Sequence, residues 1–302
     1  MSRTGQLGMG GWRSIRCLFL GGLASGFGVV WLGRADGVVL PSDAGEVRVP
    51  TAPLSLFNGK DLSGFRTWLV DSGPDDPRSV FGVADGEIRI SGNGLGYLGT
   101  VDRFRDYRLV VEYRWGRCTW GERRGKARDS GIFLHARGPD GNSDDGHGAF
   151  MAAVECNLFE GATGDFLLIR GHDEAARRLV PRLRVRARSV RDPEGWFTWD
   201  PAGDWQELSL WGRVNWRDKS PRWEDRFGFR GPRDVERRPG RWNRVEVVCV
   251  ADSITVWLNG IRVNQGVGLG WTDGRILLQC EGSEIFFRRV ELHPVAPPPS
   301  LE

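Results

Sequence analysis

Short segments with alternating apolar and polar residues recur along this sequence, separated by Gly, Asp and Asn turns. The clearest is residues 106–115, where every second side chain is Leu, Val, Tyr or Trp. Such alternation is typical of a strand with one buried face. Residues 254–258 lead into Asn259-Gly260, a strong hairpin signal because both residues tolerate positive φ. No run of roughly 12 residues has convincing helical periodicity, so the pattern predicts antiparallel sheets packed as a sandwich.

The chain is expected to contain one folded domain with extensions at both ends. Residues 36–53 are small, polar and contain Pro, which is typical of a linker, and the Pro-rich end is extended. The predicted segments are a signal peptide at 1–35, a linker at 36–53, a β-sandwich domain at 54–293 and a tail at 294–302.

Residues 1–35 have the layout of a secretory signal. Arg13 and Arg16 precede an apolar run from Cys17 to Leu32, and the segment ends on the small residue Ala35. The run is interrupted by glycines and is shorter than the roughly 20 residues that span a bilayer. We expect export to the periplasm or the extracellular space, with no stable membrane insertion after cleavage. An uncleaved N-terminal anchor is the alternative.

The charge of the chain argues against a nucleic-acid partner. The formal net charge is +3, and four positive charges lie in the first 35 residues, where there is no acid. Removing that segment leaves +3 − 4 = −1. A nucleic-acid binder needs a concentrated positive face, which a nearly neutral chain does not supply.

The sequence offers few metal or disulfide signals. Cys156, Cys249 and Cys280 lie in strand-like runs, which favours buried thiols over disulfides. No Cys-x-x-Cys or His-x-x-x-His spacing indicates a structural zinc site. Glu160 and Asp165 could ligate a divalent cation through hard oxygens, but their Gly-rich neighbours fit a turn equally well. The cofactor is therefore left open.

Three expected strands carry polar side chains opposite their apolar residues. Because alternate side chains face opposite ways, we expect these polar groups to line one sheet face if the strands are neighbours. The set is His135, Glu155, Asn157, Gln279 and Glu281. An imidazole, carboxylates and carboxamides without lysines suggest a site, and a merely solvated outer face is the alternative.

Residues 155–160, Glu-Cys-Asn-Leu-Phe-Glu, resemble the Glu-x-Asp-x-x-Glu strand of laminarinase-type glycoside hydrolases. In that strand a bulge brings two glutamates to one face as nucleophile and acid/base. Glu155 and Glu160 would then make a retaining glycosidase. Asn157 stands at the aspartate position and cannot share a proton, which weakens this interpretation.

Five blocks in order resemble the 3-keto-disaccharide hydrolase family, long described as a domain of unknown function. The first reads Leu-Phe-Asn-Gly-Lys-Asp-Leu-Ser-Gly-Phe, and the second Asp-Ser-Gly-Ile-Phe-Leu-His. The blocks span residues 56–65, 129–135, 155–166, 240–260 and 278–288. The resemblance implies an all-β, concanavalin A-like jelly-roll sandwich of two antiparallel sheets with long decorated loops. It also implies a carbohydrate substrate.

The resemblance further implies a hydrolase that cleaves glycosidic bonds in sugars already oxidised at carbon 3. The ketone acidifies the C2 hydrogen, so a base can remove it and the glycosidic oxygen leaves by elimination. By hypothesis His135 or Glu155 is the base and Glu281 is a second carboxylate. The expected substrate-binding residues are Asn157, Gln279 and Arg288. Asn157 stands where the family usually has Gln, and a structural salt bridge is the alternative for Arg288.

A non-catalytic carbohydrate-binding module is the alternative from another class. Six tryptophans lie between residues 196 and 223, and indole rings can stack on sugar rings or serve as packing anchors. A binder would show an exposed tryptophan row and dispersed acids. The enzyme hypothesis instead requires His135, Glu155 and Glu281 to lie close together.

Overall fold

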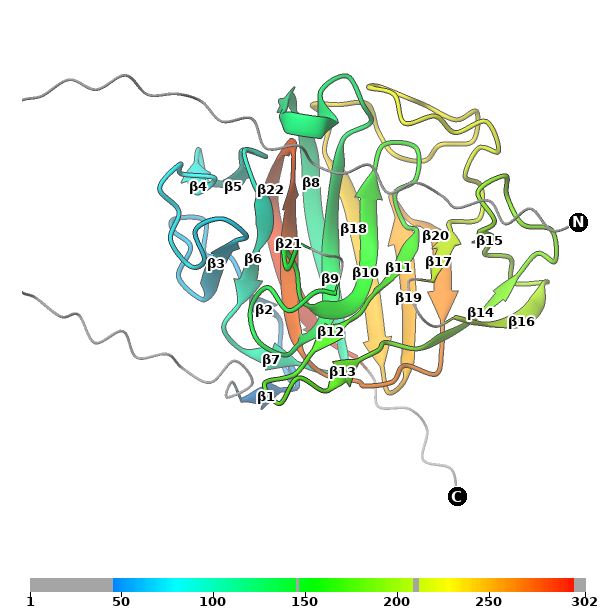
Figure 1. Ribbon diagram of the computed structural model, residues 1–302, viewed down its shortest axis with the longest axis horizontal. Coiled ribbons are helices and arrows are strands. Elements are labelled where there is room, and N and C mark those ends of the chain that lie inside the picture. The colour runs from blue at the N-terminus through cyan, green and yellow to red at the C-terminus, as the bar shows by residue number, and fades with distance from the viewer. Residues whose placement is uncertain (1–45, 145–146, 209–211, 296–302) are drawn as a thin grey trace, which may run out of the picture. The chain divides into compact units, whose positions relative to one another are not determined.

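The computed structural model describes residues 46–144, 147–208 and 212–295 (Figure 1). The predicted signal peptide, most of the predicted linker and the tail from residue 296 lie outside these residues. Within the predicted linker, β1 (Val47–Arg48) pairs in parallel with β7 (Arg103–Phe104). In the described part of the chain, no helix has the length and apolar character needed to cross a membrane.

Two large β-sheets form the body of the described chain. The first sheet contains, in spatial order, β15 (Phe197–Thr198), β17 (Arg213–Asn215), β11 (Phe166–Ile169), β10 (Ala152–Phe159), β9 (Asp129–Arg137), β21 (Arg275–Glu281), β6 (Leu95–Thr100) and β3 (Phe65–Leu69). Its pairings are antiparallel except that between β15 and β17.

The second sheet is antiparallel throughout. It contains, in order, β20 (Ile261–Gly266), β19 (Ser253–Leu258), β18 (Asn243–Val250), β8 (Tyr107–Thr119), β22 (Ser283–Pro294), β5 (Glu87–Ile90) and β4 (Phe81–Ala84), with β2 (Leu54–Ser55) also on β22. Among the described residues, the loops carry two small ladders and one 3₁₀ turn. These are β12 (Gly171–His172) with β13 (Arg178–Leu179), β14 (Leu183–Ala187) with β16 (Asp204–Leu208), and η1 (Gly121–Arg123).

The two segments that the sequence analysis named form a strand and a hairpin as predicted. In β8 the predicted apolar face, from Leu109 to Trp115, is buried between the sheets. The turn between β19 and β20 is Asn259-Gly260, and both residues have positive φ, of 50° and 85°. An Asn and a Gly adopt this left-handed backbone with little strain, which is why the pair closes the hairpin.

The core lies between the two sheets, whose strands overlap in the view of Figure 1. Val154, Cys156 and Leu158 of β10 face it from the first sheet. Cys249 of β18 faces it from the second sheet. As predicted, Cys156, Cys249 and Cys280 are buried free thiols. The all-β, jelly-roll sandwich with long decorated loops is confirmed.

Candidate active site

The outer face of the first sheet, turned away from the core, is divided into two halves. Over one half, Phe150 and Met151 pack on Phe133 and Leu277, so this part of the face is covered. The other half carries carboxyl and carboxamide groups from the three neighbouring strands β9, β10 and β21. These groups are Asp129, Glu155, Asn157, Gln279 and Glu281, and we call them the polar cluster.

Glu155 lies at the centre of the polar cluster. It is 3% exposed and its side chain leans over Gly131 of the adjacent strand. A Cβ added to Gly131 would lie 2.3 Å from Glu155 Oε1, so no residue with a side chain fits there without moving the carboxyl group. Asn157 pairs with Gly131 in the register of β9 and β10. The glycine in the second sequence block therefore makes room for Glu155.

Charged and amide groups hold the other two carboxylates of the cluster. Gln279 Nε2 donates to Glu281 Oε2 at 2.7 Å. Arg123 Nη1 donates to Asp129 Oδ2 at 3.0 Å, and its Nη2 donates to Asp225 at 2.5 Å. These donors fix the orientation of both carboxylates.

The protonation of the polar cluster is strongly perturbed. Burial raises the pKa of the Glu155 carboxyl well above its usual range, and the nearby Glu281 and Asp129 raise it further. Burial also raises the pKa of Asp129, Glu281 adds to this rise, and Arg123 opposes it. Like charges in a buried site oppose one another's ionisation, so the surroundings favour the protonated form of Glu155 and of Asp129.

Two carboxamide oxygens in the cluster have no hydrogen-bond partner among the described residues. Asn157 Oδ1 and Gln279 Oε1 are buried and make no hydrogen bond within the part of the chain that the structure describes. Asn157 and Gln279 are 3% and 2% exposed. Because an unpaired buried polar atom is costly, such atoms often mark the place where a ligand binds. Polyhydroxylated ligands can donate to both oxygens.

His135 does not join the polar cluster, and the prediction that it faces outward is wrong. Leu134 pairs with Val154 and Arg137 with Ala152, so β9 holds one extra residue at this point. The bulged His135 has φ of 54° and packs edge-on against the Tyr107 ring, with centroids 5.6 Å apart. A bulge reverses the alternation that the prediction assumed. Burial lowers the pKa of His135 to about 4.

Arg288 lies in the other sheet and does not reach the cluster either. Phe287 pairs with Tyr113 and Arg289 with Glu112, so Arg288 is an extra residue in β22. Its side chain is exposed, with Nε 2.6 Å from Glu112 Oε2. The structural salt bridge, which was the alternative for this residue, is what the structure contains.

Glu160 and Asp165 are both fully buried and bound by protein donors. Glu160 accepts from Arg128 Nη1 at 2.6 Å and from the backbone N–H of Gly228 at 3.0 Å. Asp165 accepts from Arg213 Nη2 at 2.6 Å and from the Trp216 N–H at 2.7 Å. Both are 0% exposed. In the described ranges, no group of three His, Cys, Asp or Glu side chains is placed to hold a metal ion.

The sequence reasoning missed three charged residues of this region. Asp129 stands at an alternate position of β9 with Gly131 and Phe133, so all three belong to the same face of the sheet. The alternation used for the other residues could therefore have identified Asp129. Arg123 and Arg213 act on the cluster from η1 and β17. No local pattern gives the positions of these two arginines, because they come from other parts of the chain.

The tryptophans of the loop region do not form an exposed row among the described residues. Trp199 and Trp216 are buried in the core. Trp205 is exposed, and Arg184 and Arg186 lie over its ring. Trp223 is half-buried and packs against Phe159. Trp211 lies outside the described residues.

Comparison with known proteins gives one family. The model of the family described as 3-keto-alpha-glucoside-1,2-lyase-like domain matches residues 52–293. That range contains every residue of the polar cluster. A search of curated proteins gave no match.

Several solved structures resemble the chain at low sequence identity. A candidate glycosyl hydrolase from Parabacteroides distasonis ATCC 8503 is 17% identical, with a TM-score of 0.45, covering 81% of this chain and 94% of that one. A β-glucanase from Bacillus licheniformis is 9% identical, with a TM-score of 0.40 and coverages of 82% and 100%. A carbohydrate-binding module from Bacillus subtilis is 9% identical, with a TM-score of 0.39 and coverages of 76% and 94%.

Proposed function

Since the chain belongs to the 3-keto-alpha-glucoside-1,2-lyase-like domain family, we propose that it cleaves the glycosidic bond of sugars that carry a ketone at carbon 3. Membership of this family makes the chain a carbohydrate-active, glycoside-acting protein. The observation that carries the finer proposal is the polar cluster, in which two buried carboxyls of raised pKa lie beside carboxamide oxygens that have no partner among the described residues.

The reaction needs a base, an acid and a donor to an oxyanion. Removal of the C2 proton leaves an electron pair that the C3 ketone takes up as an enolate. The enolate then expels the C1 oxygen, and a C1–C2 double bond forms. Donors on the C3 oxygen lower the barrier because they stabilise its developing charge. Water later adds across the double bond to give the free 3-keto sugar.

The polar cluster supports an assignment of these roles. Glu281, whose Oε2 accepts from the Gln279 amide, takes the C2 proton. Glu155, protonated at neutral pH because of its raised pKa, donates to the leaving oxygen. Asn157 donates through Nδ2 to the C3 oxygen. Glu155 then takes a proton from the incoming water while Glu281 returns its proton to C2, which restores the starting state.

This assignment differs from the sequence-based hypothesis in two respects. Glu155 acts as the acid rather than the base, and His135 is left out because it faces Tyr107 in the interior. The retaining glycosidase that would use Glu155 and Glu160 is disfavoured, because the Glu160 carboxylate is fully buried against Arg128. A non-catalytic binding module would not need a buried carboxyl whose pKa is raised by its neighbours.

The test is to incubate the purified protein with methyl 3-keto-α-glucoside and with its unoxidised parent. We expect release of methanol from the keto sugar alone. Glu155→Gln should remove this activity, whereas Glu224→Gln, a control at a carboxylate that is 67% exposed, should retain it. Release from the parent alone, or from neither compound, would overturn the proposal.

Export is part of the same proposal. In the periplasm or the extracellular space, the protein would be in contact with glycan fragments. N-terminal sequencing of the protein recovered outside the cytoplasm tests this step. A mature chain that begins near residue 36 supports export with cleavage, and full-length protein held at the membrane would support the uncleaved anchor.

A further inference from the structure

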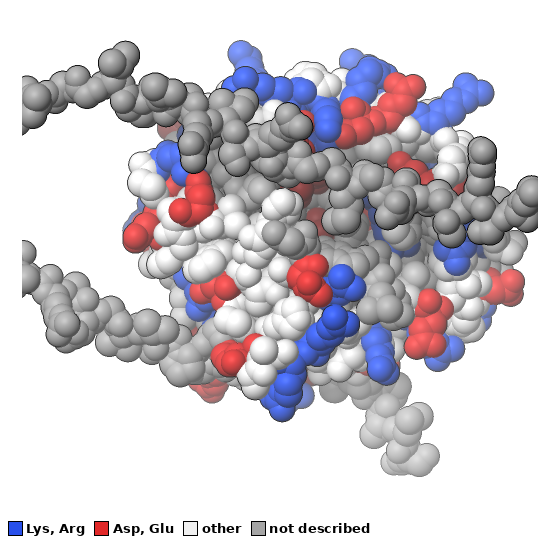
Figure 2. All heavy atoms as spheres, in the orientation of Figure 1, with Lys and Arg blue, Asp and Glu red and all other residues white. Residues whose placement is uncertain are grey.

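Positive charge is concentrated in one segment of the chain. Residues 177–191 contain seven arginines and no aspartate or glutamate, and all seven side chains are exposed. The whole chain has a formal net charge of +3, so all other residues together carry +3 − 7 = −4. In Figure 2, basic side chains gather in the lower part of the face in view, in the area where Figure 1 labels β13 and β14. The segment therefore forms a local basic surface on a chain that is otherwise slightly acidic.

β14 arranges four of these arginines in a line. Its residues Leu183, Val185 and Ala187 are buried in the core. Because successive side chains of a strand point to opposite faces, the residues that alternate with them face outward. We call these four exposed side chains the arginine row: Arg182, Arg184, Arg186 and Arg188. Alternate residues of a strand lie about 7 Å apart, so the row is about 20 Å long.

Most charges of the row have no carboxylate partner among the described residues. Within that part of the chain, Arg188 is the only member of the row in an ion pair, with Nε 3.2 Å from Asp200 Oδ2. Arg184 and Arg186 lie over the ring of the exposed Trp205, with their Cζ atoms 5.2 and 4.8 Å from its centroid. A guanidinium that stacks on a ring keeps N–H groups at its edge for an anion. The Trp205 ring therefore orients two charges of the row without neutralising them.

Carboxylates border the row along one side. β16 pairs antiparallel with β14, and its exposed Glu207 stands opposite Arg184 in the register. The exposed Asp204 of β16 stands opposite Ala187, next to the end of the row. The positive stretch is therefore about one strand wide on this side.

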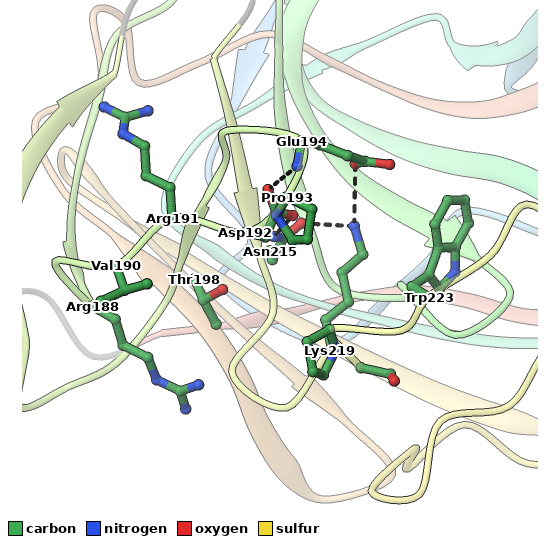
Figure 3. A pocket seen from close by; sticks show the side chains of 12 residues that line it. Arg188, Val190, Arg191, Asp192, Pro193, Glu194, Thr198, Asn215, Lys219 and Trp223 are labelled. Carbon is green, nitrogen blue, oxygen red and sulfur yellow. Dashed lines mark hydrogen bonds and ion pairs between the residues drawn. The ribbon is translucent and has the colours of Figure 1, made fainter.

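The row ends at a cavity of about 370 Å³. Arg188 and Arg191 line it, and in Figure 3 both guanidinium groups lie on the left of the view, whereas Lys219 lies on the right. Asp192 and Glu194 also line the cavity, and Glu194 is 49% exposed. These two acids end the positive stretch, so an anionic chain that follows the row stops at the rim of the cavity.

The shape of the row fits a single narrow polyanion. A bilayer or a nucleic-acid duplex is wider than one strand, and its phosphates would also meet Glu207 and Glu194. Like charges placed opposite one another oppose such binding. An acidic polysaccharide carries carboxylate or sulfate groups at intervals along one chain, and the guanidinium fork matches groups of this kind. The chain belongs to a carbohydrate-active family, which favours a polysaccharide over other narrow polyanions.

We propose that the arginine row is a binding surface for an acidic polysaccharide, whose anionic groups pair with Arg182, Arg184 and Arg186 along β14. The row holds the protein on the polymer and takes no part in bond cleavage. None of its residues belongs to the polar cluster. The inference is therefore independent of the proposed function, and its test measures binding alone.

Isothermal titration calorimetry at low salt, where screening is weak, measures the affinity. The probes are hexasaccharides of galacturonic acid and of heparin, with maltohexaose as the uncharged control. We expect wild type to bind at least one acidic hexasaccharide and not maltohexaose. The row variant, which combines Arg182→Gln, Arg184→Gln and Arg186→Gln, should bind about tenfold more weakly, a factor of about two for each exposed ion pair.

A matched control separates the row from the overall charge. Arg105→Gln, Arg226→Gln and Arg233→Gln together remove the same number of charges, at side chains that are 53%, 61% and 75% exposed. This control variant should keep the wild-type affinity. Thermal melting checks that both variants are folded. If the row variant is unfolded, Arg182→Glu, at the position just before β14, replaces it, and we expect about a fourfold loss of affinity.

Binding of the galacturonate probe would show that carboxylates suffice, and binding of the heparin probe alone would show that sulfates are needed. Either result, weakened in the row variant and kept in the control variant, supports the inference. Equal affinities of the two variants, equal binding of maltohexaose, or no binding of either acidic probe would overturn it. A single-stranded thymidine oligonucleotide and phosphatidylglycerol vesicles are titrated in parallel. Tighter binding of one of these than of both acidic hexasaccharides, lost in the row variant, would assign the row to that partner and overturn the inference.

Discussion

Glu155→Gln tests the protonation of the polar cluster without any substrate. Folding raises the pKa of Glu155 well above the value of 4.5 expected when the chain is unfolded. The resulting stability is fully present below about pH 4.5 and is lost as the pH rises through the folded pKa, because only the unfolded chain then releases the proton. Glutamine has nearly the same shape over Gly131 but cannot titrate.

The size of the effect follows from proton linkage. One carboxyl that is protonated in the fold and ionised when unfolded lowers the free energy of unfolding by about 1.4 kcal/mol for each pH unit. Wild type carries this slope between the two pKa values of Glu155, and the variant does not. Since Glu155 is 3% exposed, solvent screening does little to narrow the pH range over which this slope applies. Relative to wild type, the variant should therefore gain stability as the pH rises.

Urea unfolding of both proteins between about pH 5 and about pH 8 measures this slope. We expect the difference in free energy of unfolding between variant and wild type to change steadily in favour of the variant. A difference that stays constant over the whole range would mean that Glu155 is ionised in the fold. That result would refute both its raised pKa and its role as the acid.

Three further substitutions test the geometry. Gly131→Ala would place a methyl group 2.3 Å from Glu155 Oε1, so we expect a loss of about 1–3 kcal/mol in urea unfolding and a fall in kcat of about a hundredfold. Arg288→Ala removes an exposed pair with Glu112 and should leave kcat/KM at the wild-type value, with less than about 1 kcal/mol lost in unfolding. His135→Leu removes a neutral buried imidazole whose pKa falls from 6.5 to about 4 on folding, and wild type should lose about 3 kcal/mol as the pH drops through this window. The free energy of unfolding of the variant, measured by urea unfolding, should fall less over this pH range. An equal fall in both proteins would contradict the burial of His135 in its neutral form.

Alternation along single strands predicted most of the polar cluster. Glu155 and Asn157 on one strand, and Gln279 and Glu281 on another, face the side opposite to their apolar neighbours, as expected. Parity is reliable there because β10 and β21 are regular through these residues. The family resemblance then supplied what parity lacks, namely a reason to place the two strands in one site.

Parity failed where a strand contains an extra residue. His135 and Arg288 are each the additional residue of a bulge, and a bulge reverses the face of the residues around it. No turn residue or proline in the sequence marks either bulge. The positions of Arg123 and Arg213 depend on how distant segments fold over the sheet, and a local pattern carries no information about that.

The last strands of the described chain occupy the middle of both sheets. β21 is inserted between β9 and β6, and β22 between β8 and β5. A nascent chain that has not yet reached residue 275 therefore has four interior strand edges without partners, which are exposed to pairing with other chains. Gln279 and Glu281 belong to β21, which is synthesised near the end of the domain. The polar cluster is therefore complete only when synthesis of the domain is almost finished. We therefore expect a chain truncated before residue 275 to aggregate rather than to fold as a smaller domain.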